Sequence, residues 1–317
     1  MTKIAFIFPG QGSQTVGMGA SFVANNEKSK EFYERADEVL GFSLTDYMLN
    51  GPQEKLTLTY HAQPALLTTG VMIAQQLQDA GITPDFTAGH SLGEYSAFVV
   101  SNVLTFEDAV TTVHRRGVFM DEAVPAGQGA MAAILALDGE TLAAVCKEVS
   151  DAGEVVQVAN FNCPGQIVIS GTKQGVDLAC VKAKEAGAKR ALPLVVSGPF
   201  HSSLMQQAAD KLATVVKELS LNKPQIPVVS NVTSQILTDV EQVKREMVDQ
   251  VTNSVQWEKN IEKLIAEGVT VFIECGPGKV LSGLVKKIDR SVQTYCVYDE
   301  ESLAQVVEAS KEWTQWV

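Results

Sequence analysis

The hydrophobic positions of the chain fall into short apolar runs, which predict strands, and longer stretches with helical spacing, which predict helices. Residues 3–8 form an apolar run that we expect to be a first buried strand. Helical spacing predicts helices over 27–40, 63–77 and 105–123, the second with Pro64 in its first turn. Strands and helices that alternate in this way are typical of a mainly parallel sheet with helices on both faces.

From about residue 127 the spacing of the apolar positions changes. Strands are expected at 130–137, 154–160, 166–170 and 189–195, with helices at 139–149 and 175–186. This β-α-β-β-α-β order is that of a ferredoxin-like unit. Strands at 226–231 and 270–275 and helices at 241–251 and 257–267 are expected to follow. We therefore predict an α/β fold in which a small ferredoxin-like subdomain, residues 127–196, is inserted into a large α/β-hydrolase-like catalytic domain, residues 1–126 and 197–317.

The composition is that of a soluble and acidic globular protein. Of the 317 residues, 45% are hydrophobic and 20% are charged, and the formal net charge of −12 disfavours nucleic acid as a partner. No apolar run reaches the ~18 residues of a membrane span, and the run at 4–8 is too short for a signal-peptide core. The five cysteines are scattered without a C-x-x-C pair, so neither disulfides nor a metal site are predicted. We expect a cytoplasmic protein that does not bind membranes.

The segment Gly89-His90-Ser91-Leu92-Gly93 is the most informative motif of the chain. It matches the pattern G-x-S-x-G, follows an apolar-leaning stretch and opens a helix-compatible run at 95–100. A strand-turn-helix of this kind holds the serine in a tight turn, and its two glycines keep the neighbouring backbone from clashing. The first amides of the helix then point at the group that the serine attacks. Ser91 is therefore the candidate nucleophile.

A glycine-rich turn at 9–19 follows the first expected strand. A dinucleotide fingerprint would need a third small residue at Thr15, and a phosphate loop would need a lysine after Gly17, where Met18 stands. Neither nucleotide-binding interpretation fits. The remaining interpretation is a loop that brings backbone amides close to a ligand.

A serine nucleophile needs a base within hydrogen-bonding reach, usually a histidine. His201, in a tight loop after Gly198-Pro199-Phe200, is the best of four candidates by elimination. His90 should project away from Ser91, His114 lies beside two arginines, and His61 lies just before the helix expected to start at Pro64. The group that orients His201 stays open among four residues that follow it: Asp210, Asp239, Asp249 and Gln250.

Six motifs occur in the order and near the spacing of a known family. They are Gly10-Gln11-Gly12-Ser13-Gln14, Gly89-His90-Ser91-Leu92-Gly93-Glu94, Arg115-Arg116-Gly117, Asn160-Phe161-Asn162-Cys163-Pro164-Gly165-Gln166, Gly198-Pro199-Phe200-His201-Ser202 and Glu274-Cys275-Gly276-Pro277-Gly278. Over essentially its whole length the chain resembles the malonyl-CoA:acyl carrier protein transacylases of bacterial type II fatty acid synthesis. That family is related to the acyltransferase domains of fatty acid and polyketide synthases.

The resemblance implies a role for each matching residue. Ser91 would be acylated with His201 as its base, Gln250 would orient His201 through a carbonyl oxygen, and the amides of Gln11 and Leu92 would form the oxyanion hole. The remaining roles concern the substrate. Arg116 would hold the malonyl carboxylate, Phe200 would select malonyl over branched groups, and Asn162 would brace its loop or contact the acyl group. His90 is expected to have a supporting role among the substrate-binding residues. Cys163 departs from the small residue expected there, which puts nothing central in doubt.

The activity implied by the resemblance is a ping-pong transfer of malonyl from malonyl-CoA to the phosphopantetheine thiol of acyl carrier protein. Coenzyme A and the carrier protein would be substrates and partners, no further cofactor is expected, and a monomer is expected. A serine esterase or thioesterase and a non-catalytic carrier-binding module are the alternatives. Arg116 disfavours the first and the intact site residues disfavour the second. Two basic clusters could meet an acidic partner, although solvated helix faces explain them better: Lys182, Lys184, Lys189 and Arg190, and Lys279, Lys286, Lys287 and Arg290.

Overall fold

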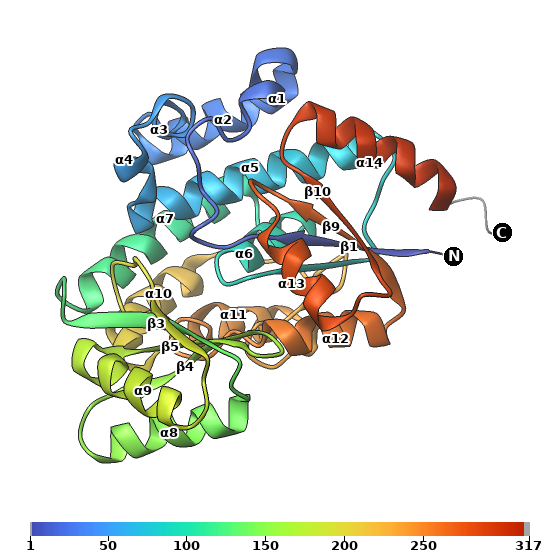
Figure 1. Cartoon of the computed structure of the whole chain (residues 1–317). Coiled ribbons are helices and arrows are strands. Elements are labelled where there is room, and N and C mark those ends of the chain that lie inside the picture. Colours follow the sequence, from blue (N-terminus) through green and yellow to red (C-terminus); the bar gives the residue numbers. More distant parts are fainter. Residues whose placement is uncertain (1, 314–317) are drawn as a thin grey trace.

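Two separate β-sheets organise the chain in the computed structural model, which describes residues 2–313 (Figure 1). The larger sheet has the strand order β10-β9-β1-β2-β7-β8, and every neighbouring pair is parallel except β7 and β8. Its strands are β1 (Lys3–Phe8), β2 (Phe86–Gly89), β7 (Val228–Val229), β8 (Ile236–Leu237), β9 (Val269–Cys275) and β10 (Gln293–Val297). The predicted mainly parallel sheet is confirmed, and β9 is followed by a further strand, β10, that the sequence interpretation omitted.

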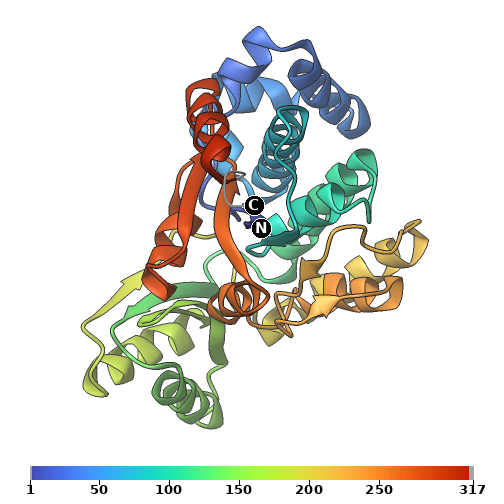
Figure 2. The same cartoon turned by 90° about the vertical axis from the view of Figure 1, so that its right-hand side faces the viewer.

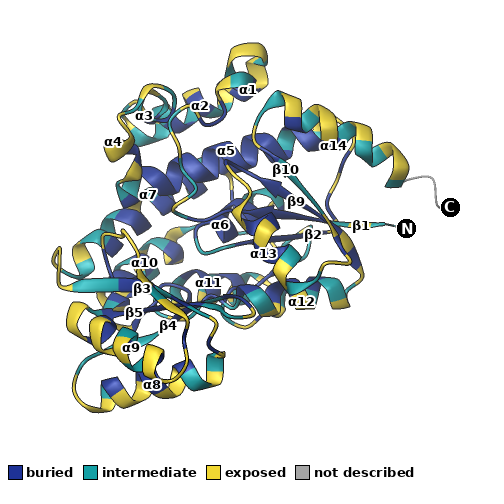
Figure 3. Ribbon diagram, in the orientation of Figure 1, coloured by how far each residue is buried: buried dark blue, intermediate teal, exposed yellow. Residues whose placement is uncertain are grey.

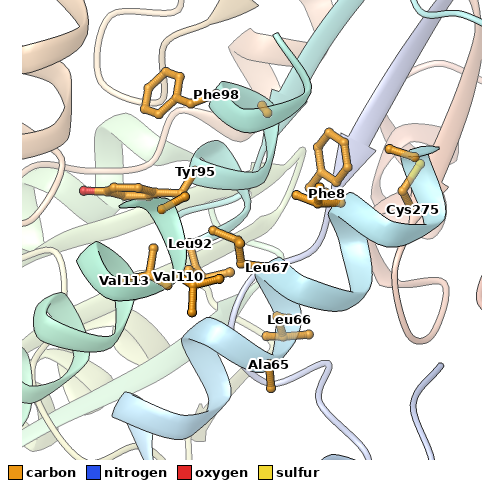
Figure 4. Packing of buried hydrophobic residues seen from close by; sticks show 14 of the residues in the cluster. Phe8, Ala65, Leu66, Leu67, Leu92, Tyr95, Phe98, Val110, Val113 and Cys275 are labelled. Atoms are coloured by element: carbon orange, nitrogen blue, oxygen red, sulfur yellow. The ribbon is translucent and has the colours of Figure 1, made fainter. Parts of the chain in front are cut away.

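Helices cover both faces of this sheet because side chains alternate along each strand. Phe6 and Phe8 of β1 point into one apolar cluster, and Ala5 and Ile7 point into another on the opposite face. The first cluster is completed by α5 (Thr59–Asp79), α6 (Gly93–Val100) and α7 (Phe106–Ala123), the second by α12 (Trp257–Ala266) and α13 (Val280–Ile288). Figure 3 shows α5 buried along most of its length. Figure 4 shows side chains of α5, α6 and α7 packed around Leu92.

Helix α5 begins at Thr59, so the expectation that Pro64 lies in its first turn is wrong. Proline has no N–H, which leaves the carbonyl one turn earlier without its helical partner. That carbonyl, on Tyr60, instead accepts a hydrogen bond from Nδ1 of His114 at 2.7 Å. A side chain of α7 thus replaces the missing bond, and the helix continues through the proline. His61 consequently lies inside α5, where its ring stacks on Tyr47.

The remaining helices surround these layers. They are α1 (Ala20–Asn25), α2 (Glu27–Leu40), α3 (Leu44–Asn50), α4 (Gln53–Thr57), the short 3₁₀ helix η1 (Ser203–Met205), α10 (Gln206–Glu218), α11 (Val240–Asp249) and α14 (Glu300–Trp313). Of the strand expected at 226–231, only the two residues of β7 are in strand conformation. The chain reverses there, because the N–H of Ser230 donates to the carbonyl of Gln235 at 2.9 Å and leads into β8.

The smaller sheet is antiparallel and lies at the bottom of the views in Figures 1 and 2. Its order is β4-β5-β3-β6, with β3 (Gly129–Leu135), β4 (Val156–Cys163), β5 (Gln166–Thr172) and β6 (Arg190–Pro193). Helices α8 (Gly139–Asp151) and α9 (Lys173–Glu185) pack on one face and enclose a separate apolar cluster. The chain therefore has a mixed α/β fold with a mainly parallel sheet and a separate antiparallel sheet.

Strand β4 extends to Cys163, although residues 161–165 were expected to form a loop. The extension is stabilised by a segment of the larger part of the chain. The N–H of Phe161 donates to the carbonyl of Val255 at 2.9 Å, and the N–H of Val255 donates to that of Ala159 at 2.8 Å. Asn160 and Asn162 are therefore held on a strand next to the larger sheet.

Within residues 2–313, no helix is long and apolar enough to cross a membrane. The same residues contain no group of three or more histidine, cysteine or acidic side chains placed to hold a metal ion.

Candidate active site

Ser91 lies in the turn between β2 and α6, as the G-x-S-x-G motif predicts. Its φ of 52° is in the left-handed region, which residues other than glycine rarely adopt. Gly93 allows the turn to approach β1, because a Cβ at that position would lie 2.1 Å from the carbonyl oxygen of Phe8. The turn thus leaves the Ser91 side chain partly exposed at the carboxyl end of the parallel strands.

His201 lies beside Ser91, and its ring nitrogens have distinct partners. The Oγ of Ser91 is 2.7 Å from Nε2, and Nδ1 faces two carbonyl oxygens, that of Gln250 at 2.8 Å and that of Asn253 at 3.2 Å. Since a carbonyl only accepts, Nδ1 carries the proton and Nε2 accepts from the serine. Burial, and then the charge of Arg116, lower the pKa of His201 to about 3, so the ring is neutral at pH 7.

The orienting group on His201 is main chain and not a carboxylate. Asp210, Asp239 and Asp249 are all exposed, and none of their carboxylates bonds to the imidazole. Asp239 accepts from the N–H of Gln242 at the start of α11, and Asp210 accepts from Gln206. Gln250 meets His201 through its backbone carbonyl. The carbonyl of Asn253, which no sequence signal pointed to, is the second acceptor.

Arg116 is 1% exposed and places its guanidinium beside Ser91, whereas Arg115 is exposed. Its Nη1 donates to the side-chain oxygen of Gln63 at 2.8 Å. Its Nη2 donates to the side-chain oxygen of Gln250 at 2.7 Å and to Oγ of Ser91 at 3.3 Å. Within residues 2–313, no acidic side chain bonds to the guanidinium, and its Nε has no hydrogen-bond partner. Burial lowers the pKa of Arg116, but an arginine remains charged at neutral pH.

Two backbone amides at the site are unused among the described residues. The N–H groups of Gln11 and Leu92 donate to no acceptor there, and both residues line the same cavity as Ser91. The glycine-rich loop can approach the Ser91 turn because Gly10 has no side chain. A Cβ on it would lie 2.5 Å from the carbonyl oxygen of His90.

The cavity has a volume of about 260 Å³ and lies between the two sheets. His90 turns away from Ser91 and donates from Nε2 to Oδ1 of Asn162 at 2.8 Å, and burial lowers its pKa. Phe200, 6% exposed, forms part of the wall. The mouth carries apolar residues of which several are exposed: Leu194, Val195, Val196 and Val280. The structure thus gathers all nine sequence-predicted site residues around one cavity, although Gln250 reaches it through its contacts with His201 and Arg116.

Comparison with known proteins identifies the class of protein. Residues 5–309 match the acyl transferase domain family, and the chain belongs to that family. It is 54% identical over 312 residues to the malonyl CoA-acyl carrier protein transacylase of Bacillus subtilis (strain 168), which covers 98% of this chain and 98% of that protein. The resemblance seen in the sequence is thereby confirmed.

Solved structures agree with this assignment. An acyl carrier protein S-malonyltransferase from Vibrio cholerae O1 biovar eltor str. N16961 matches with a TM-score of 0.94 and 47% identity, over 96% of this chain and 100% of that one. A malonyl-transacylase in complex with its type II PKS acyl-carrier protein matches with a TM-score of 0.95 and 43% identity, over 97% of this chain and 100% of that one.

Proposed function

We propose that this protein transfers the malonyl group from malonyl-CoA to the phosphopantetheine thiol of acyl carrier protein, through a malonyl ester on Ser91. The names of its relatives and the chemistry of the cavity both support this activity. The structural match to a malonyl-transacylase bound to its carrier protein supports acyl carrier protein as the partner.

The observation that carries the proposal is the buried guanidinium of Arg116. A cation enclosed by protein is costly unless an anion pairs with it. Its described partners are neutral, and it lies 3.3 Å from the serine oxygen. A malonyl group attached at that oxygen would supply the anion, because its free carboxylate extends from the acyl carbon toward the guanidinium. A hydrolase of neutral esters has no use for this charge.

The acylation step uses the geometry around His201. The oxygen of Ser91 attacks the thioester carbonyl while its proton passes to Nε2 of His201. The Gln11 and Leu92 amides would donate to the oxyanion, each contributing on the order of 3 kcal/mol. When the C–S bond breaks, the thiolate of coenzyme A takes the proton from Nε2. The two carbonyls at Nδ1 hold the ring in the tautomer that this cycle requires.

The second half of the cycle repeats these steps with a new thiol. The phosphopantetheine thiol of the carrier gives its proton to Nε2 and attacks the ester carbonyl, and Ser91 leaves with that proton. No further cofactor is needed, because both thiols are substrates. Phe200 would limit branching next to the carbonyl, while Asn162 and His90 would present polar groups to the thioester.

Two finer structural assignments belong to the same proposal. The strand order β4-β5-β3-β6 with two helices on one face supports a ferredoxin-like subdomain of residues 127–196. The turn of Ser91 after a parallel strand supports an α/β-hydrolase-like catalytic domain, residues 1–126 and 197–317. We propose that the protein acts as a cytoplasmic monomer.

Mass spectrometry of the intact protein tests the activity directly. Incubation with malonyl-CoA alone should add the mass of one malonyl group, and peptide mapping should locate it on Ser91. Added holo-acyl carrier protein should then remove the group and become malonylated. Protein that transfers malonyl without forming this adduct would overturn the proposed mechanism.

A further inference from the structure

Two buried carboxyl groups lie behind Ser91, and the proposed reaction gives neither of them a part. Glu94, in the first turn of α6, is 0% exposed, and Glu246, in α11, is 4% exposed. Burial, and then the neighbouring Glu246, hold the pKa of Glu94 well above its usual range, and burial raises the pKa of Glu246. Adjacent buried carboxyls share a proton, which leaves their remaining lone pairs available to accept hydrogen bonds.

The first hydrogen bond to Glu94 comes from a residue that clamps the Ser91 turn. The backbone N–H of Asn231 donates to Oε1 of Glu94 at 2.8 Å. The Asn231 side chain spans the turn, accepting from the N–H of Ser91 at 2.7 Å and donating to the carbonyl of Gly89 at 2.7 Å. Because the left-handed φ of Ser91 is unfavourable by itself, this clamp stabilises the conformation that exposes its oxygen.

The second hydrogen bond to Glu94 comes from the residue that joins His201 to Arg116. The Nε2 of Gln250 donates to Oε2 of Glu94 and, at 3.1 Å, to the carbonyl of Ser91. The oxygen of the same amide accepts from Nη2 of Arg116 at 2.7 Å. Because the carboxyl oxygen of Glu94 accepts from the NH₂ group of the Gln250 amide, the oxygen of that amide is left facing the guanidinium.

We propose that Glu94 is a positioning residue, which holds Ser91 in place through Asn231 and the Arg116 guanidinium in place through Gln250. The Arg116 part rests on the proposed function, since it concerns the malonyl carboxylate. The Ser91 part is independent of the acyl group. The side chain of Glu94 makes no hydrogen bond to Ser91 or Arg116, so it positions both groups through these two intermediates.

The variant Glu94→Gln tests both connections, because it replaces one acceptor oxygen with an NH₂ group of similar size. Two donors would then face each other, either at Gln250 or at the N–H of Asn231. In the first case the Gln250 amide reverses and turns its NH₂ toward Arg116, which loses its acceptor. In the second case the clamp on the Ser91 turn weakens.

Three measurements on the purified full chain separate these effects. They are kcat and KM for malonyl transfer, the same constants for acetyl transfer from acetyl-CoA, and the rate at which phenylmethylsulfonyl fluoride modifies Ser91. In the last reaction the serine oxygen forms a bond to sulfur, and fluoride leaves with the serine proton taken up by the base. Its rate reports the position of Ser91 without any carboxylate or carrier.

We expect E94Q to lower kcat/KM for malonyl transfer about 10- to 100-fold, as small displacements of catalytic groups do. A reversed Gln250 amide would raise the KM for malonyl-CoA more than that for acetyl-CoA and leave sulfonylation unchanged. A weakened clamp would lower kcat for both acyl groups and slow sulfonylation in parallel. Either pattern supports the proposal.

Glu246→Gln is the matched control, since it makes the same change in the same buried pair. Glu246 accepts from the hydroxyl of Ser230 and, at 3.0 Å, from the N–H of Val232, and it has no hydrogen bond to Gln250. Its carboxyl also interacts with Glu94 and with the N–H of Asn231, but in E246Q that N–H keeps its 2.8 Å bond to Glu94. The Ser230 hydroxyl can rotate to accept from the new amide. We expect E246Q to change every rate less than about threefold. Equal losses in E94Q and E246Q, or unchanged rates in E94Q, would overturn the proposal.

Gln250→Met provides a second route if E94Q does not fold. It removes the link between Glu94 and Arg116 together with the 3.1 Å bond to the carbonyl of Ser91, so it should raise the KM for malonyl-CoA more than that for acetyl-CoA. Equal increases in the two KM values would contradict the Arg116 connection. Failure of the proposed function would show separately, as the absence of a malonyl adduct on the unmodified protein.

Discussion

The parallel and the antiparallel sheet present different chemistry to the same cavity. The elements around the parallel sheet contribute Ser91 from a turn, His201 from a loop and Arg116 from within α7, and the last two are only 3% and 1% exposed. The antiparallel sheet contributes Asn160 and Asn162 from within a strand. The charge and the serine thus come from the elements around the parallel sheet, and the antiparallel sheet adds neutral hydrogen-bonding groups. We therefore expect the chemical step to depend on the residues around the parallel sheet. Residues of the antiparallel sheet are expected to affect how the substrate is held.

The largest effect should follow the change Ser91→Ala. Loss of the nucleophile should reduce malonyl transfer more than ~10⁴-fold, as removal of a serine nucleophile does elsewhere. The measurement is initial-rate transfer to holo-acyl carrier protein, combined with intact mass. An adduct still forming on this variant would place the nucleophile at another residue.

A second test compares Arg116→Ala with Arg115→Ala, two adjacent arginines of opposite exposure. Hydrogen bonds to a charged group are worth about 1.5–3 kcal/mol, so loss of Arg116 should reduce kcat/KM for malonyl-CoA about 100-fold. Acetyl transfer should fall far less, and R115A should behave like the unmodified protein. Equal losses for malonyl and acetyl transfer would rule out the carboxylate role.

The change Asn162→Ala tests the contribution of the antiparallel sheet to substrate binding. This change removes the acceptor of the His90 hydrogen bond, a contact of about 1 kcal/mol, so we expect the KM for malonyl-CoA to rise about fivefold with little change in kcat. Steady-state kinetics with both acyl-CoA substrates would measure it. A large loss of kcat would show that the antiparallel sheet takes part in the chemical step.

The smallest expected effect concerns pH. Because the pKa of His201 is lowered to about 3, the imidazole stays neutral as the pH falls from 8 to 5. Rapid-quench measurement of Ser91 acylation should therefore change less than about twofold over that range, whereas an imidazole with an ordinary pKa of about 6.5 would lose most of its basic form. A marked decline centred near 6.5 would contradict the assigned environment.

The same pKa shift gives a direction for stability. The pKa of His201 is lower in the folded protein than in the unfolded chain, so the unfolded state binds more protons between about pH 6.5 and 3. Stability contributed by this group is therefore fully present above about pH 6.5 and is lost as the pH falls through that window. In R116A the decline should be smaller, because a positive neighbour no longer opposes protonation.

The sequence predicted correctly those elements whose bounds are set by neighbouring residues in the chain. The strand at 3–8 and the helix at 27–40 have the expected bounds, and the G-x-S-x-G turn lies between a strand and a helix. The start of α5 was missed because His114, far along the chain, completes the hydrogen bonding around Pro64. The end of β4 was missed because its last residues pair with Val255.

The partners of His201 show a second limit of sequence interpretation. Both acceptors at Nδ1 are backbone carbonyls, which every residue carries, so no residue type marks the position. Asn231 is similar, since it lies in no recognised motif and yet spans the Ser91 turn. Groups that act through the main chain or through long-range contacts are found only in the three-dimensional structure. Ser91 and Arg116, in contrast, can be recognised in the sequence from their side chains.

The pairing of β4 with Val255 has a mechanical consequence. The segment that carries Val255 also carries Asn253, whose carbonyl holds the imidazole, and Gln157 of β4 donates to the carbonyl of His201 at 3.4 Å. A tilt of the antiparallel sheet would therefore be transmitted to the imidazole of His201. Such a tilt would change the 2.7 Å distance between Nε2 of His201 and Oγ of Ser91, and proton transfer between these two atoms requires that they stay within hydrogen-bonding reach.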